Sequence, residues 1–153
     1  MRRKKAVTVA AAITLLVVLV VTYIVPQPVV TQNVIVTRVV DGDTIIVEGG
    51  DSIRLLDIDT PERGEPCASN ATALLKYLID GKEVTLVSGR EDRDLYGRFL
   101  RYVFLNDTMI NLVMVREGFA NLYIVNRDPR YYDAFIQAEQ AAKKENLCVW
   151  GVN

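Results

Sequence analysis

Histidine is absent from the 153-residue chain. This excludes Ser-His-Asp triads, Cys-His dyads, histidine-ligated zinc and the HExxH helix of metalloproteases, because each of them needs an imidazole. Hydrolytic chemistry in this protein must therefore use carboxylates, hydroxyls, arginines and a hard metal ion that prefers oxygen ligands. Cysteine is nearly as scarce, since Cys67 and Cys148 are the only two.

A surplus of positive charge is also missing. The chain has 18 basic and 19 acidic residues, and its formal net charge is −1. Four of the basic residues lie in positions 1–5, so the remainder has 14 basic residues against all 19 acidic ones. This balance excludes a histone-like, generally basic nucleic-acid binder as the main part of the chain. The length allows one domain.

An uncharged, mostly apolar segment, Ala6–Val25, directly follows the four basic residues at positions 2–5. A helix of this length spans about 30 Å, the hydrocarbon thickness of a bilayer. The pattern predicts a single-pass membrane anchor with residues 1–5 in the cytoplasm and the rest of the chain outside. A cleaved signal peptide is the alternative, although the segment is longer than usual and ends at Pro26 without a small-x-small site. Residues 26–33 are predicted to form a linker stiffened by two prolines.

Export would affect two other features. In an oxidising compartment Cys67 and Cys148 can form a disulfide, and two free buried thiols are the alternative. Asn70 and Asn106 each begin an Asn-X-Thr tripeptide. These tripeptides permit glycosylation where the organism glycosylates exported proteins, and their occurrence by chance is an equally good explanation.

The rest of the chain predicts strands interrupted by helices. Runs of β-branched and apolar residues predict five strands, at 34–40, 44–48, 53–58, 83–87 and 99–105. Asp41-Gly42 is a strong hairpin signal between the first two strands, and residues 49–51 form the next turn. Loops are predicted at 60–66 and 88–97.

Three helices complete the pattern. Apolar residues at helical spacing over 71–78 predict an amphipathic helix that ends near Gly81. Asn111 is a plausible N-cap for a short helix that ends at Gly118. Asp128-Pro129 pairs an N-cap with a proline at the first helical position, for a helix that runs to about Asn146. Residues 34–153 are therefore predicted to form an α+β domain, mainly β with helices, built on a five-stranded OB-fold barrel.

Four acidic residues gather around the predicted strand ends. Asp41 and Asp43 lie in the first hairpin, and Asp59 and Glu62 follow the third strand. Carboxylates from adjacent strands, with a backbone carbonyl such as that of Thr60, would make a minimal Ca²⁺ site. Ordinary turn chemistry is the alternative for each pair taken alone.

Two arginines accompany these acids. Arg54 lies inside an otherwise apolar strand, where a cation is costly unless it meets an anion, and Arg98 precedes the fifth strand. Arg54 could simply pair with Asp57 or Asp43, and Arg98 could be a solvated charge at a strand end. Guanidinium groups also bind phosphate oxygens in two-point fashion. As a set, the arginines and acids suggest metal-assisted attack of water on a phosphodiester.

Five sequence blocks occur in the order and approximate spacing of the staphylococcal nuclease family. They are Val40–Thr44, Arg54–Glu62, Asp94–Arg98, Val115–Ala120 and Trp150. The chain resembles that family from about Val34 to Trp150. The resemblance implies an OB-fold barrel with three helices, acting as a monomer. It also implies Ca²⁺-dependent cleavage of DNA and RNA, with single-stranded or denatured substrates favoured, no sequence specificity and 3′-phosphorylated products.

The resemblance also assigns roles around the metal. Asp43 and Asp59 would be the carboxylate ligands, and the carbonyl of Thr60 would be a third ligand. Glu62 would be the general base or would order the attacking water. Asp41 would lie beside the metal without binding it.

Other positions would contact the substrate. Arg54 and Arg98 would hold the scissile phosphate, and Tyr96 would belong to the nucleotide pocket. The family's other stacking tyrosine has no clear counterpart, and Tyr123 is the nearest candidate. Trp150 is expected to pack the carboxy-terminal segment onto the barrel.

The sequence also departs from the family pattern. The loop from Glu62 to Cys67 is short, and Leu95 stands where a basic residue is usual. The acidic domain predicts weak, salt-sensitive binding of polyanions through few contacts. Two other functions remain possible: an OB module that binds nucleic acid without cleaving it, and an extracytoplasmic interaction domain that uses the barrel as a scaffold.

Overall fold

The computed structural model describes residues 29–124 and 128–151. The predicted membrane segment 6–25 and its basic flank 1–5 lie outside these residues. Within the described ranges no helix is both long and apolar enough to cross a membrane.

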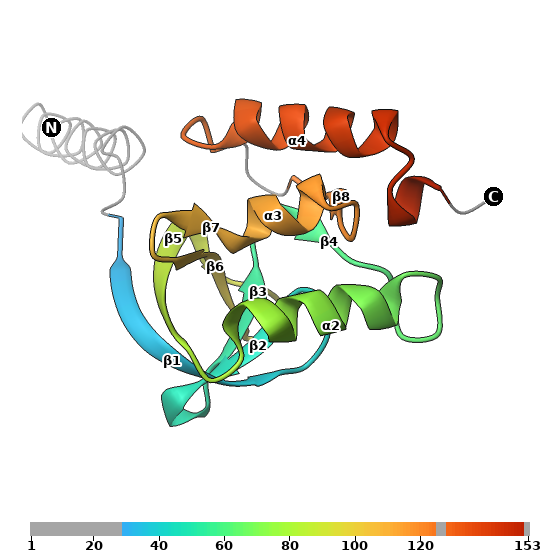
Figure 1. The fold of residues 1–153 in the computed structure, drawn as a ribbon. Coiled ribbons are helices and arrows are strands. Elements are labelled where there is room, and N and C mark those ends of the chain that lie inside the picture. Colours follow the sequence, from blue (N-terminus) through green and yellow to red (C-terminus); the bar gives the residue numbers. More distant parts are fainter. Residues whose placement is uncertain (1–28, 125–127, 152–153) are drawn as a thin grey trace, which may run out of the picture.

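Five strands form a closed barrel (Figure 1). They are β1 (Thr31–Val39), β2 (Thr44–Val47), β3 (Ser52–Leu55), β5 (Glu83–Arg93) and β6 (Phe99–Leu105). Neighbours in the order β3-β2-β1-β5-β6 pair antiparallel, and a parallel pairing of β3 with β6 closes the circle. This confirms the predicted five-stranded, OB-like α+β fold.

The helices and the shorter elements surround the barrel. The helices are α2 (Ala68–Ile79), α3 (Ile110–Arg116) and α4 (Tyr132–Lys144), and Figure 1 shows α3 between α4 and the barrel. The short strands β4 (Ile58–Asp59) and β8 (Asn121–Leu122) pair as a second sheet, and β7 (Thr108–Met109) extends β6. Two 3₁₀ turns are η1 (Glu48–Gly50) and η2 (Cys148–Trp150).

One hydrophobic core fills the barrel and the space beneath the helices. Val34 and Val36 of β1 are buried at the spacing of two that a strand gives, and Val39 is buried after the register shift between Val36 and Arg38. They meet buried side chains from the other strands and from the helices, including Ile45, Leu55, Leu75 and Phe135. Burying each such side chain contributes about 1.5–3 kcal/mol.

The first strand begins earlier than predicted. β1 starts at Thr31 rather than Val34, because residues 31–33 pair with residues 85–87 of β5. The end of the predicted linker 26–33 is therefore part of the barrel.

The predicted third strand 53–58 is wrong in its second half. β3 ends at Leu55, and Asp57 adopts a left-handed backbone conformation with φ of 61° before the chain enters β4. The buried Asp57 carboxylate accepts a hydrogen bond of 2.6 Å from the hydroxyl of Tyr102. Burial and this carboxylate raise the pKa of Tyr102, so the hydroxyl stays protonated and donates.

The predicted loop 88–97 is also wrong over most of its length. β5 continues through the charged residues to Arg93, and only Asp94–Gly97 form a turn. Pairing with β6 stabilises the extension, because the guanidinium of Arg93 lies 3.5 Å from the centre of the Phe99 ring and that of Arg101 lies 4.8 Å from it.

Two predicted helix caps are not caps. α3 begins at Ile110 and includes Asn111. α4 begins at Tyr132, four residues after Asp128. The Asp128 carboxylate accepts the Arg130 N–H at 3.0 Å in the turn before the helix and pairs with the Arg130 guanidinium at 2.6 Å. The predicted end of the shorter helix at Gly118 agrees with its φ of 72°.

The side chain of Asn111 is fully buried and ties the helix to the barrel. Its amide oxygen accepts a bond of 2.8 Å from the Val103 N–H, and its amide nitrogen donates to the carbonyls of Leu56 and Arg101 at 3.0 and 3.3 Å. A cap position would have left this side chain at the surface, and the sequence alone does not distinguish the two uses of asparagine.

Asn111→Leu is expected to destabilise the protein by about 2–3 kcal/mol, because the buried backbone groups lose their partner while the side chain keeps the same number and branching of heavy atoms. The matched control is Asn70→Leu, at an exposed position of α2. Urea unfolding followed by circular dichroism measures both, and equal midpoints for the two variants would contradict the prediction.

A disulfide joins Cys67 to Cys148 across 81 residues, with the two Cα atoms 6.0 Å apart. Cys67 directly precedes α2 and Cys148 begins η2. The bond therefore ties the start of α2 to the segment that follows α4. Trp150 lies in the same segment, with the ammonium group of Lys143 over its ring at 4.3 Å.

Candidate active site

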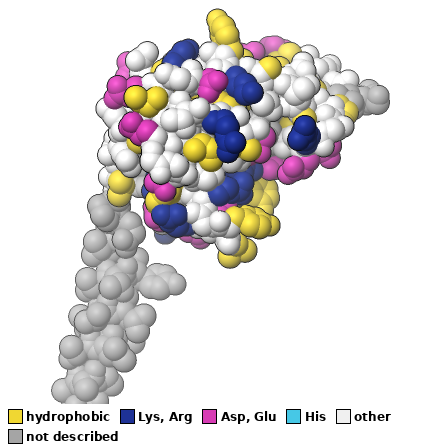
Figure 2. Space-filling model, turned by 90° about the horizontal axis from the view of Figure 1, so that it is seen from below, with side chains coloured by type: hydrophobic (Ala, Val, Ile, Leu, Met, Phe, Trp, Pro, Cys, Tyr) yellow, Lys and Arg dark blue, Asp and Glu magenta, His cyan; other side chains and the backbone are white. Residues whose placement is uncertain are grey.

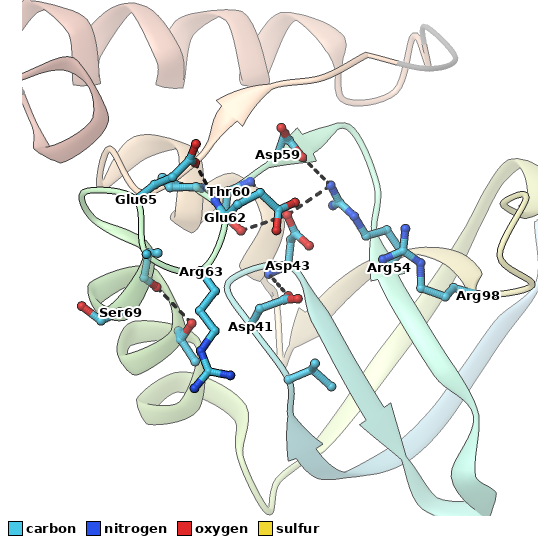
Figure 3. Close-up of a pocket in the computed structure, with 15 residues that line it drawn as sticks. Asp41, Asp43, Arg54, Asp59, Thr60, Glu62, Arg63, Glu65, Ser69 and Arg98 are labelled. Atoms are coloured by element: carbon cyan, nitrogen blue, oxygen red, sulfur yellow. Dashed lines mark hydrogen bonds and ion pairs between the residues drawn. The ribbon is translucent and has the colours of Figure 1, made fainter.

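One cleft of about 920 Å³, the main cleft, contains all the residues predicted to bind metal or the scissile phosphate (Figure 3). Its lining includes Asp41, Asp43, Arg54, Asp59, Thr60, Glu62 and Arg98. These residues come from the β1–β2 turn, from β3 and β4, from the loop before α2 and from the turn before β6. The barrel thus brings together residues that the sequence spreads over more than fifty positions.

The β1–β2 turn has glycine for a packing reason. A Cβ atom at Gly42 would lie 2.7–2.8 Å from side-chain atoms of Thr60 and Ala71, closer than real contacts allow. The small residue lets the turn approach the segment after β4. Asp41 accepts the Asp43 N–H at 3.1 Å, which fixes the backbone between the two acids.

Asp43 is the most constrained acid in the main cleft. One carboxylate oxygen accepts bonds of 2.9 Å from both the N–H and the hydroxyl of Thr60, and the other accepts one of 3.2 Å from Thr44. Burial raises the pKa of Asp43, while the charge of Arg54 acts in the opposite direction. An additional cation beside this carboxylate would therefore be favourable.

Arg54 connects two of the predicted metal ligands. One of its terminal nitrogens lies 3.1 Å from Asp43 and 2.8 Å from Asp59, and the other donates to the carbonyls of Leu55 and Ile58 at 3.0 and 2.8 Å. The side chain is only 13% exposed. These contacts of the Arg54 guanidinium hold the β3–β4 turn, and they place both carboxylates within reach of a single nitrogen atom.

Arg98 is oriented by Asp94, a residue for which the sequence predicts no role. The Asp94 carboxylate accepts a bond of 2.6 Å from Nε of Arg98 and also accepts the backbone N–H groups of Tyr96 and Arg98. Partial burial acts to raise the pKa of Asp94, but these bonds outweigh it and the pKa lies below its ordinary value. The spacing of four residues across a tight turn is the signal that was available in the sequence.

The short loop that carries Glu62 is a stapled turn. Glu65 donates its N–H to the Glu62 carbonyl at 2.9 Å, and its carboxylate accepts the Glu62 N–H at 2.7 Å. Gly64 has a φ of 99°, which suits the third position of a type II turn. Two reciprocal bonds thus hold the loop whose shortness distinguishes this chain.

The donor set fits a hard divalent cation such as Ca²⁺. Every candidate ligand is an oxygen, and Asp43 and Asp59 approach the same point in the structure. In the part of the chain that the structure describes, no cluster of three or more acidic or cysteine side chains is already assembled around a vacant position. Backbone oxygens and water would have to complete the coordination.

A second cavity of about 310 Å³, the side pocket, adjoins the main cleft, and Arg54 and Arg98 line both. Tyr96 and Tyr123 line this side pocket together, with Tyr96 86% exposed. Leu95 is fully exposed beside them. The structure therefore places both predicted stacking residues next to the arginines.

Comparison with known proteins identifies the family of the chain. The family model described as "Staphylococcal nuclease homologue" matches residues 52–152. The chain belongs to the staphylococcal nuclease family. The match covers Arg54, Asp59, Glu62 and Arg98 but begins after the β1–β2 hairpin.

Individual relatives in the staphylococcal nuclease family extend the likeness to most of the chain. The chain is 37% identical to the thermonuclease of Staphylococcus intermedius over 131 residues, which cover 78% of this chain and 76% of that protein. It is 35% identical over 132 residues to the SPbeta prophage-derived endonuclease YokF of Bacillus subtilis, and 33% over 129 residues to endonuclease YncB of the same species. These two matches include 79% and 77% of this chain, but only 45% and 61% of the two Bacillus proteins. Family membership and these relatives support a nuclease of the phosphodiester-hydrolase class.

Proposed function

We propose that the protein is a Ca²⁺-dependent endonuclease that hydrolyses phosphodiester bonds of DNA and RNA without sequence specificity. The observation that carries the proposal is the meeting of Arg54 and Arg98 with Asp43, Asp59 and Glu62 in one cleft. Two guanidinium groups beside an oxygen-rich cation site match the charge of a phosphodiester under attack by water.

Each residue has a part that follows from its position. Arg54 and Arg98 bind the phosphate oxygens and neutralise the negative charge that grows in the transition state. Glu62, exposed at the rim of the main cleft, accepts a proton from the attacking water or orders it. Asp94 is a positioning residue, because it aims the guanidinium of Arg98.

Asp43, Asp59 and the backbone of Thr60 would hold the cation, with Asp41 beside them. When bound, Ca²⁺ supplies charge neutralisation at the phosphate and polarises a water molecule. Arg54 already neutralises the same two carboxylates, so a cation and this guanidinium share their negative charge.

The nucleotide next to the scissile phosphate is placed in the side pocket. Tyr96 and Tyr123 offer exposed rings for stacking, and stacking needs no particular base. Basic and acidic side chains are interspersed on the face seen in Figure 2, which supports weak and salt-sensitive binding. We further propose single-stranded substrates, 3′-phosphorylated products and a monomeric enzyme, on the family resemblance alone.

The proposed location is the outer side of a membrane, with residues 6–25 as the anchor and secretion after cleavage as the alternative. The disulfide between Cys67 and Cys148 supports an oxidising compartment, because such bonds are rare in the cytoplasm. Sequencing the mature amino terminus separates the two, since a chain that begins near Pro26 would show cleavage.

Removal of Ca²⁺ is expected to abolish cleavage while leaving the fold intact. Denatured DNA is incubated with the purified full-length chain in millimolar Ca²⁺ or in excess chelator, and circular dichroism checks the fold in both. Readdition of Ca²⁺ should restore cleavage. Analysis of the terminal phosphates of the products reports whether the phosphate stays on the 3′ or the 5′ oxygen. Equal cleavage with and without the chelator would contradict the metal requirement. Binding of DNA without any cleavage would favour a nucleic-acid-binding module.

A further inference from the structure

The main cleft extends beyond the residues that the proposed mechanism uses. Its lining continues into the stapled turn and the first turns of α2, with Arg63, Gly64, Glu65, Ala68, Ser69 and Thr72. Figure 3 shows Arg63 on the opposite side of Asp41 and Asp43 from Arg54 and Arg98. The far end of the main cleft therefore has a positively charged side chain, that of Arg63.

Arg63 differs from the other two arginines because its guanidinium group is not paired with a carboxylate of the described residues. Arg54 binds Asp43 and Asp59, and Arg98 binds Asp94. Within residues 29–124 and 128–151, the guanidinium of Arg63 makes no hydrogen bond or ion pair. All five of its N–H donors are therefore available to an anion that enters the cleft.

The local backbone holds Arg63 in place. It occupies the second position of the turn that two bonds close between Glu62 and Glu65. The disulfide at Cys67 anchors the chain two residues after that turn. Binding an anion here would restrict the Arg63 side chain but would not have to order the loop.

A hydroxyl group provides a second donor at this end. Ser69 is exposed, and its hydroxyl makes only a long bond of 3.3 Å to the neighbouring Asn70, which a phosphate oxygen could replace. Thr72 is not such a donor, because its proton is given to the Ala68 carbonyl at 3.0 Å. The nearby Glu65 carboxylate is turned back onto the Glu62 N–H.

We infer that Arg63, with Ser69, forms a second phosphate subsite for the nucleic-acid strand on the far side of the scissile phosphate from the side pocket. The inference rests on the proposed function and adds the path that the strand takes through the main cleft. A strand with one nucleotide beside Tyr96 and a phosphate at Arg63 has its cleaved bond in the interior. The arrangement therefore favours internal cleavage over the removal of terminal nucleotides.

The test compares a long substrate with a minimal one, using the full-length chain in mild detergent. The long substrate is a ten-nucleotide oligodeoxythymidine, and the minimal one is a nitrophenyl phosphodiester of thymidine, which has no second phosphate. Arg63→Gln is expected to lower kcat/KM for the ten-mer by about 5–10-fold and to change that for the ester less than about 2-fold. Arg63→Lys should recover most of the loss. Arg90→Gln, at an exposed arginine outside both cavities, is the charge-matched control and should change neither.

Binding measured in excess chelator makes the result independent of catalysis. Fluorescence anisotropy of a labelled ten-mer at several salt concentrations should show weaker binding by Arg63→Gln and a log-log salt slope reduced by about 0.7, the value for one phosphate contact on a single strand. If the wild type binds in this way but cleaves nothing, the subsite stands and the proposed function fails. Equal losses for the ten-mer and the ester, or a salt slope and ten-mer affinity equal to those of the wild type, would overturn the subsite.

Discussion

Replacing Arg98 with alanine is expected to lower the turnover of nucleic acid by about 10²–10³-fold, the usual effect of removing one preorganised partner of the transition-state charge. Arg98 lines both the main cleft and the side pocket, and Asp94 holds its Nε at 2.6 Å. Since the orientation is fixed before substrate arrives, the loss should appear mainly in kcat rather than in KM.

Three companion variants sharpen this result. Arg98→Lys keeps the charge but loses two-point binding, so it should recover only a small part of the activity. Asp94→Asn should reduce kcat less than Arg98→Ala does, because the guanidinium remains but is no longer aimed. Arg116→Ala, at an exposed arginine outside both cavities, should leave the kinetics unchanged. Activity retained by Arg98→Ala in steady-state assays would refute the assigned role.

Loss of the disulfide is the second large effect that we expect. Replacing both Cys67 and Cys148 with alanine should lower the free energy of unfolding by about 2–5 kcal/mol, and the chain-entropy model gives a value near the top of that range for a bond that spans 81 residues. Both cysteines also have positive φ angles, of 69° and 28°, which the bond helps to maintain.

Urea unfolding followed by the fluorescence of Trp150 measures the effect, with and without a reducing agent. The reductant should destabilise the wild type but should leave the double variant unchanged, which separates loss of the bond from loss of side-chain packing. A wild type whose midpoint is the same in both conditions would contradict the prediction. Cleavage assays on the reduced protein additionally report whether the stapled turn at Glu62 needs this anchor.

The barrel was predictable because its signals are local. β6 has the predicted bounds Phe99–Leu105, and Asp41-Gly42 does mark the turn between the first two strands. The predicted acids and arginines were found in one cleft because they lie in β3 and β4 or in the turns and loops that join the strands at one end of the fold. Short motifs at strand ends thus carried most of the site.

The remainder depended on contacts between distant residues. The segment 88–93, with four charged residues and a glycine, has the composition of a loop, yet it is a strand because Arg101 and Phe99 lie opposite its two ends. Asn111 is of a residue type that often caps helices, yet its amide is used by the Leu56 carbonyl and the Val103 N–H of the barrel. The contact of Asp94 with Arg98 likewise depends on the turn that the folded chain makes. The unpaired guanidinium of Arg63 follows from the distance at which the fold keeps the described acidic side chains.

The seam where β3 meets β6 has a consequence for the cell that makes this protein. Arg54 pairs with Leu100 across that seam, and Arg98 directly precedes β6, so the two arginines that we propose to bind phosphate become neighbours only when the circle of strands is complete. If the chain is exported as proposed, a nascent or unfolded copy passes through the cytoplasm without a working centre. Such a copy would leave the nucleic acids of the cytoplasm uncut until the strands have closed outside.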